Sequence, residues 1–112
     1  MKELTKEDQL LGLKQPQKNG QQVPRAVISV LGEDKVGIIA TLSRVIADYQ
    51  GNIVQINQNI IQSMFSMIMI VETDKLTVDF EKFKHNLESK REELGVRVVV
   101  QSEKVFRYMH RI

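Results

Sequence analysis

Cysteine and tryptophan are absent from the chain, and histidine is scarce. Without cysteine there is no disulfide, no thiolate nucleophile and no cysteine-ligated metal site. The two histidines, His85 and His110, lie in different segments and lack the spacing of metal ligands. No paired carboxylates, and no nucleophile with a base beside it, stand in a recognisable motif. The sequence therefore predicts no catalytic residues, no metal site and no cofactor.

A long hydrophobic run is missing as well. The longest uncharged stretch, Tyr49 to Val71, is interrupted by many amide and hydroxyl side chains, which are costly to bury unpaired in lipid. The first twenty residues, Met1 to Gly20, are charged from the second residue onward and lack the apolar centre of a signal peptide. We therefore expect a cytoplasmic protein that makes no membrane contact.

Charge of one sign is not in excess. Sixteen Lys and Arg residues against fourteen Asp and Glu residues leave a formal net charge of +2. Nucleic acids are bound by concentrated basic surfaces, so this balance does not favour a nucleic-acid partner. With 42% hydrophobic and 27% charged residues, the composition is typical of a globular protein, and 112 residues suit one domain.

The chain divides at Pro24. Residues 1–24 contain a short stretch that could form a helix from a Thr5 cap, followed by KQPQKNGQQVP, which has no apolar period. We interpret residues 1–24 as a flexible N-terminal leader and linker, and residues 25–112 as the folded domain.

Six main elements are predicted within the domain, in the order strand, helix, strand, strand, helix, strand. Apolar and β-branched runs indicate the strands, and apolar steps of three and four indicate the helices. The expected strands are Arg25–Leu31, Asn52–Ile61, Met64–Glu72 and Val96–Gln101, and the expected helices are 36–49 and 79–94. Gly51 stands at the C-cap of the first helix, Asp79 opens the second, Gly95 ends it, and Ser102 could cap a short last helix.

This order predicts an α+β fold. Two right-handed crossovers joined by a hairpin give a ferredoxin-like βαββαβ sandwich, a four-stranded antiparallel sheet with both helices on one face, followed here by a short C-terminal helix. The strand 52–61 is rich in amides and is expected at an edge, whereas the strands at 25–31 and 64–72 are expected in the centre. Ser63 lies in the hairpin turn where glycine is common, so the turn type stays open.

The stretch SVLGEDKVGIIATL has the glycine spacing of a phosphate-binding loop. Ile38 and Ile39 follow Gly37 where such a loop needs Lys and a hydroxyl residue, so ATP and GTP are not expected. Free N–H groups at a helix start still suit a carboxylate. From the residues alone two interpretations stay open: half of a small-molecule site, or a tight turn at Gly32 with close helix-on-strand packing at Gly37.

The segment VISVLGEDKVGIIATLSRVIADYQGNIVQI, residues 27–56, resembles an ACT domain, a small regulatory module that binds amino acids. The family's loop of Asp, two residues, Gly and an aliphatic is matched by Asp34, Gly37 and Ile38, and GNIVQI resembles the start of its second strand. Stand-alone members related to the glycine-cleavage repressor resemble the chain further, through a Met-rich hairpin and the ending VFRYMHRI. The resemblance implies an ACT domain over residues 25–112.

The resemblance also implies a ligand site between the first loop of one subunit and the second strand of its neighbour. The implied ligand-binding residues are Gly32, Asp34, Lys35, Val36, Gly37, Ile38, Asn52, Ile53 and Val54. Backbone N–H groups near Val36 to Ile38 would hold a carboxylate, and Asp34 or the amide of Asn52 would accept from an ammonium group. Asp34 also fits the role of a helix cap, and Lys35 that of a solvated side chain.

A homodimer through the second strand is expected on separate grounds. Nothing between Asn52 and Gln62 is charged or proline, so this predicted edge has no side-chain guard against strand addition. Both faces of the hairpin carry apolar residues, and the helices can cover only one of them. The other face is expected to be buried by a second subunit.

These observations together predict a non-enzymatic regulatory domain. It would bind a small amino-acid-like ligand at a homodimer interface and signal to a metabolic or transcriptional protein partner. A constitutive protein-interaction adaptor without a ligand stays open as an alternative. An RNA-binding ferredoxin-like module is disfavoured, because the two central strands offer only Phe65 for base stacking.

Overall fold

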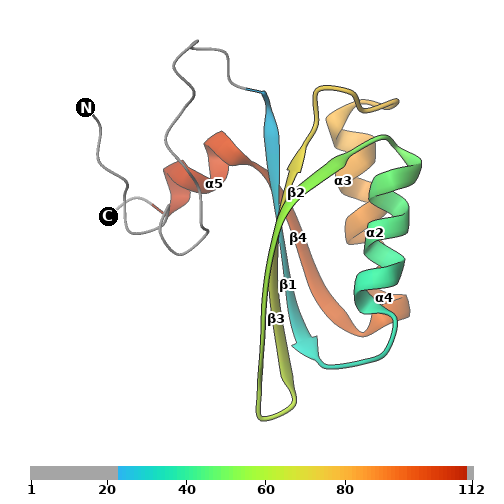
Figure 1. Cartoon of the computed structure of the whole chain (residues 1–112), viewed down its shortest axis with the longest axis vertical. Helices are drawn as coiled ribbons and strands as arrows, with labels where there is room; N and C mark the ends of the chain where they lie inside the picture. Colours follow the sequence, from blue (N-terminus) through green and yellow to red (C-terminus); the bar gives the residue numbers. More distant parts are fainter. Residues whose placement is uncertain (1–22, 111–112) are drawn as a thin grey trace.

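The computed structural model describes residues 23–110, and its elements follow the predicted order (Figure 1). The elements are β1 (Arg25–Glu33), α2 (Ile38–Asp48), β2 (Asn52–Ile61), β3 (Met64–Glu72), α3 (Phe80–Glu88), α4 (Arg91–Leu94), β4 (Val96–Ser102) and α5 (Glu103–Met109). Most of the predicted leader, residues 1–22, and the last two residues of the VFRYMHRI ending lie outside the described residues.

The four strands form one antiparallel sheet in the order β2-β3-β1-β4. The ferredoxin-like fold is therefore confirmed, with β1 and β3 in the centre and β2 at an edge. Figure 1 shows α2, α3 and α4 on one side of the sheet and α5 on the other. The short C-terminal helix begins as predicted, because the Ser102 hydroxyl accepts a hydrogen bond from the Val105 N–H at 3.2 Å.

The core lies between the sheet and the layer formed by α2 and α3. Side chains alternate along each strand, so every second residue of β1, β3 and β4 faces the helices. The buried core residues are Ala26, Ile28, Val30, Ile38, Leu42, Ile46, Phe65, Met67, Met69, Val71, Phe83, Leu87, Leu94, Val96, Val98 and Val100. Burial of Phe65 in this layer removes the only aromatic of β1 and β3 from the opposite face, where an RNA-binding module would stack bases.

The helix predicted over 79–94 is in fact two helices. Asp79 caps α3 as expected, since its carboxylate accepts from the Lys82 N–H at 2.8 Å. After Glu88 the ladder is disturbed: the Ser89 hydroxyl donates to the Asn86 carbonyl at 2.8 Å, and the chain tightens to a three-residue hydrogen bond at Lys90. The short helix α4 then ends at left-handed Gly95, with φ 67°, as predicted.

The first helix ends one residue earlier than the sequence indicated. Gln50, with φ 67°, takes the left-handed position after α2, and Gly51 does not. The Gln50 N–H donates to Ala47 at 3.0 Å and the Gly51 N–H to Ile46 at 2.9 Å, which is the Schellman pattern. Gly51 is needed for space instead, because a Cβ there would lie 2.8 Å from Ile46 Cγ2 and 3.0 Å from Val71 Cγ1.

The β2–β3 hairpin turns on Gln62 and Ser63, whose φ angles of 51° and 70° are both positive, as a type I′ turn requires. The register slips between Ile53 and Gln55, so Val54 is the extra residue of a β-bulge. The edge strand is thus interrupted near its start, a feature that the sequence did not reveal. From Gln55 to Ile61 the pairing with β3 is continuous.

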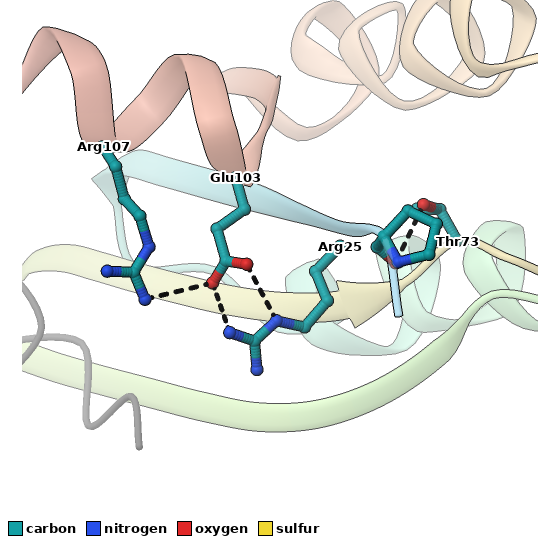
Figure 2. A network of polar contacts seen from close by, with 5 residues as sticks. Arg25, Thr73, Glu103 and Arg107 are labelled. Carbon is teal, nitrogen blue, oxygen red and sulfur yellow. Dashed lines mark hydrogen bonds and ion pairs between the residues drawn. The ribbon is translucent and has the colours of Figure 1, made fainter. Parts of the chain in front are cut away.

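The face of the sheet opposite α2 and α3 is partly covered by the chain itself. Phe106 of α5 packs against Val27 and Ile70, so α5 covers part of the face that was expected to be buried by a second subunit. Figure 2 shows how α5 is held: Glu103 accepts from Arg25 Nε at 3.0 Å and from its Nη2, and Arg107 lies 3.5 Å from the same carboxylate. On this face Leu31, Ile61 and Met64 stay exposed, and on the side of α2 and α3 the edge-strand residues Ile56 and Ile60 are exposed as well.

Candidate functional site

The predicted loop follows the end of β1 and leads into α2. Its backbone is attached to the hairpin turn, since the Asp34 N–H donates to the Ser63 carbonyl at 3.0 Å. Val36 is fully exposed, and the side chains of Asp34 and Lys35 are exposed as well. The loop therefore has a fixed position at one end of the sheet and presents its side chains outward.

The interpretation of Gly32 as a turn residue and Gly37 as a packing residue is reversed in the structure. Gly32 lies within β1 rather than in a turn, and a Cβ there would come within 2.8 Å of Val96 Cγ1. Gly37 has φ 94°, and a Cβ there would meet nothing within 4 Å. Gly32 is thus the close-packing glycine, whereas Gly37 supplies a left-handed conformation beside open space.

The N-terminus of α2 is open. Gly37 is the N-cap, so Asp34 does not cap the helix, and the first turn contains no acidic residue. The first backbone hydrogen bond of the helix runs from the Thr41 N–H to the Gly37 carbonyl at 2.9 Å, which leaves the N–H groups of residues 38–40 without an acceptor inside the helix. These donors, at the positive end of the helix dipole, match a carboxylate in charge and hydrogen bonding.

The ammonium group of Lys35 lies beside Gly95. Its Nζ lies 2.7 Å from where a Cβ of Gly95 would stand, so the ammonium group lies against the end of α4 and the start of β4. The carbonyl end of a helix attracts a cation. Lys35 thereby places a cation at the junction of α4 and β4.

The predicted site residues of β2 lie at the other end of the sheet. Asn52 stands opposite Glu72, which stands opposite Arg25 at the start of β1, whereas the loop follows the end of β1 (Figure 1). Ile53 packs against the core, and Val54 is the half-exposed bulge residue. One chain therefore does not bring the two predicted halves together.

Glu72 was missed by the sequence reasoning and belongs beside Asn52. The Asn52 amide Nδ2 donates to Glu72 Oε1 at 2.9 Å, and the oxygen of the same amide is an acceptor. Both residues line a shallow hollow of about 550 Å³ together with Gly51, Asp74 and Lys75. A two-residue hairpin without a bulge would have paired Glu72 with Ile53 instead, so only the bulge at Val54 brings Glu72 opposite Asn52.

Residues 23–110 offer neither a metal site nor a membrane-spanning helix. No group of three His, Asp or Glu side chains in this range could hold a metal ion. The helices of the same range are all too short or too polar to span a membrane.

The sheet order, the crossover helices on one face and the open loop before α2 define a small ferredoxin-like α+β domain. The sequence model of the ACT domain matches residues 25–101, and the chain belongs to the ACT domain family. This confirms the resemblance drawn from the loop. ACT domains are commonly regulatory ligand-binding domains.

Relatives and solved structures agree with this assignment. A UPF0237 protein of Methanocaldococcus jannaschii is 49% identical over 88 residues, covering 79% of this chain and 98% of that relative. An ACT domain protein from Streptococcus pneumoniae is 33% identical with a TM-score of 0.65, covering 76% of this chain and 96% of that one. A putative glycine cleavage system transcriptional repressor shares the fold, with a TM-score of 0.62 at 15% identity, covering 70% of this chain and 45% of its own.

Proposed function

We propose that this chain is a non-enzymatic regulatory ACT domain that binds a small amino-acid-like ligand at a homodimer interface and signals the bound state to a metabolic or transcriptional partner. The observation that carries the proposal is the uncapped N-terminus of α2 beside left-handed Gly37. The three N–H groups of residues 38–40 offer donors to a carboxylate, and the missing Cβ of Gly37 leaves room for it to approach.

The second half of the proposed site is the pair formed by Asn52 and Glu72. The amide oxygen of Asn52 and the carboxylate of Glu72 are acceptors that suit an ammonium group. N–H donors for a carboxylate lie at one end of the sheet, and acceptors for an ammonium group lie at the other. Together they match the two charged groups of an amino acid. Because the two sets lie apart in one chain, a second chain is needed to bring them to the same ligand.

Antiparallel pairing of β2 with its own copy would bring the halves together. In such a pair the start of β2 in one chain lies beside the end of β2, and hence the hairpin turn, of the other. The loop is attached to that turn through Asp34 and Ser63. Only β3 separates β2 from β1, so the loop lies two strand spacings, about 10 Å, from the pairing edge.

Signalling would follow from linkage between ligand binding and pairing. A ligand held by both chains binds the dimer more tightly than the separate subunits, and it therefore shifts the equilibrium toward the dimer. A partner protein that recognises only the paired sheet would then respond to the ligand concentration.

Titration calorimetry against a panel of amino acids tests the proposal. We expect saturable binding of at least one of them, and weaker binding by Ala40→Glu, which places a carboxylate in the exposed first turn of α2. The new charge competes with the ligand for the open donors and should weaken binding about tenfold while stabilising the helix by about 0.3–1 kcal/mol.

Ala40→Gln is the matched control, because it adds similar bulk without the charge and should bind as the parent does. Loss of binding with a gain in stability separates a ligand effect from unfolding. Flat titrations for the whole panel, with a folded dimeric protein, would favour the ligand-free adaptor instead.

A further inference from the structure

The two edges of the sheet differ in whether charged side chains contact their backbone. β2 forms one edge and β4 the other. Between Gln55 and Ile61 the first edge carries no charged residue and no proline. At the second edge, two charged side chains of α3 reach the backbone of β4: Lys84 Nζ donates to the Val100 carbonyl at 3.0 Å, and the Val100 N–H donates to Glu88 Oε2 at 2.9 Å.

These contacts occupy the groups that an added strand would use. In an antiparallel edge strand every second residue turns both its N–H and its carbonyl away from the sheet. Val100 is such a residue, since it stands opposite Ile28 of β1 while both of its backbone groups bond to α3. Lys84 and Glu88 are one helical turn apart and 3.5 Å from each other, so they present a donor and an acceptor side by side, as a neighbouring strand would.

The position of this pair is set by the core. Phe83 and Leu87, which are each adjacent in sequence to one member of the pair, are completely buried between α3 and the sheet. The side chains of Lys84 and Glu88 are only 34% and 29% exposed. The pair is thus held over the edge by packing rather than by its own ion pair.

We infer that the pair formed by Lys84 and Glu88 closes the β4 edge to strand addition and leaves β2 as the one open edge of the described sheet for pairing with a second copy. Pairing of β2 with β2 is symmetric and ends at two chains, whereas pairing of β2 with β4 would repeat without end. Blocking β4 therefore favours a closed dimer over an open assembly. The block at β4 stands on the contacts above, and only the use of β2 rests on the proposed function.

Removal of the pair tests the inference. Lys84→Ala/Glu88→Ala leaves the net charge unchanged and uncovers the backbone of Val100. We expect its weight-average mass in sedimentation velocity to rise with protein concentration beyond that of the parent protein. Lys90→Ala/Glu93→Ala is the matched control, because it removes an ion pair of 3.7 Å beside α4 while both hydrogen bonds of α3 to Val100 stay in place, and it should match the parent.

A mass distribution of Lys84→Ala/Glu88→Ala equal to that of the parent at all concentrations would overturn the inference. So would an equal rise of the weight-average mass in the control variant Lys90→Ala/Glu93→Ala. Lys84→Gln/Glu88→Gln, which keeps a donor and an acceptor, is expected to stay at the size of the parent. If circular dichroism shows that the double alanine variant does not fold, the single variant Glu88→Ala takes its place in the sedimentation test. It leaves the Val100 N–H without its acceptor and should also self-associate.

The same data separate this inference from the proposed dimer. A parent protein that sediments as a monomer would refute pairing through β2. Concentration-dependent growth of Lys84→Ala/Glu88→Ala relative to that monomer would still show that β4 is the guarded edge.

Discussion

At the scale of single residues, Gly32 and Gly37 show that one residue type can be required for opposite reasons. A Cβ at Gly32 would strike the Val96 side chain and backbone, at 2.8 and 3.0 Å, in a normal strand conformation. A Cβ at Gly37 would meet no atom within 4 Å, but φ 94° strains any L side chain. The spacing of the glycines in the sequence draws attention to both, but it does not show which one is needed for close packing and which one for its left-handed φ angle.

The two roles predict opposite rankings of substitutions. At Gly37, Asn should destabilise the fold less than Ala, because Asn tolerates left-handed conformations, and Ala should cost about 1–2 kcal/mol. At Gly32, Ala should cost about 1–3 kcal/mol through overpacking against Val96, and the larger Asn should cost more. Urea unfolding of the four variants measures the order. The same ranking at both positions would contradict the assignment.

At the scale of elements, the sequence predicted regular structure well and irregular backbone poorly. β2 and β3 have the predicted bounds because two strand-like apolar runs separated by two residues define a hairpin. The bulge at Val54, the break after Glu88 and left-handed Gln50 were not predicted. Each depends on a tertiary contact or a local hydrogen bond, such as that of Ser89 to Asn86, that apolar periodicity does not encode.

At this scale we predict that the packing of α5 on the sheet depends on Phe106. Phe106 is nearly buried on Val27 and Ile70 and stacks on His110, with ring centroids 4.0 Å apart. Phe106→Ala should therefore cost about 3 kcal/mol. Tyr108→Ala on the same helix removes a side chain from a residue that is 73% exposed and should change stability by less than about 0.5 kcal/mol. Equal losses in the two variants would show that α5 does not rest on the sheet through Phe106.

At the scale of the whole molecule, the candidate site is divided between the two ends of one sheet. The loop before α2 could be predicted from its residues and its resemblance to ACT domains, because its glycine and its donors are local features. The pairing of that loop with Asn52 of a neighbouring chain was implied by the resemblance alone. The residues by themselves could not give it, since the register of such a pair would depend on β2 and on the bulge at Val54. Assembly, rather than the fold of one chain, would complete the site.

A charge placed on the β2 edge is the most direct test of that assembly. Asn59 is exposed in the continuous part of β2, so Asn59→Lys should leave the subunit folded. In a symmetric β2 pair both copies gain the cation, and their repulsion should weaken dimerisation about tenfold, or ~1.4 kcal/mol. Because exposed charges are screened, added salt should partly restore the dimer. Asn59→Gln keeps the amide without charge and should dimerise as the parent does. Sedimentation at low and high salt measures both effects, and an unchanged dissociation constant for Asn59→Lys would place the interface elsewhere.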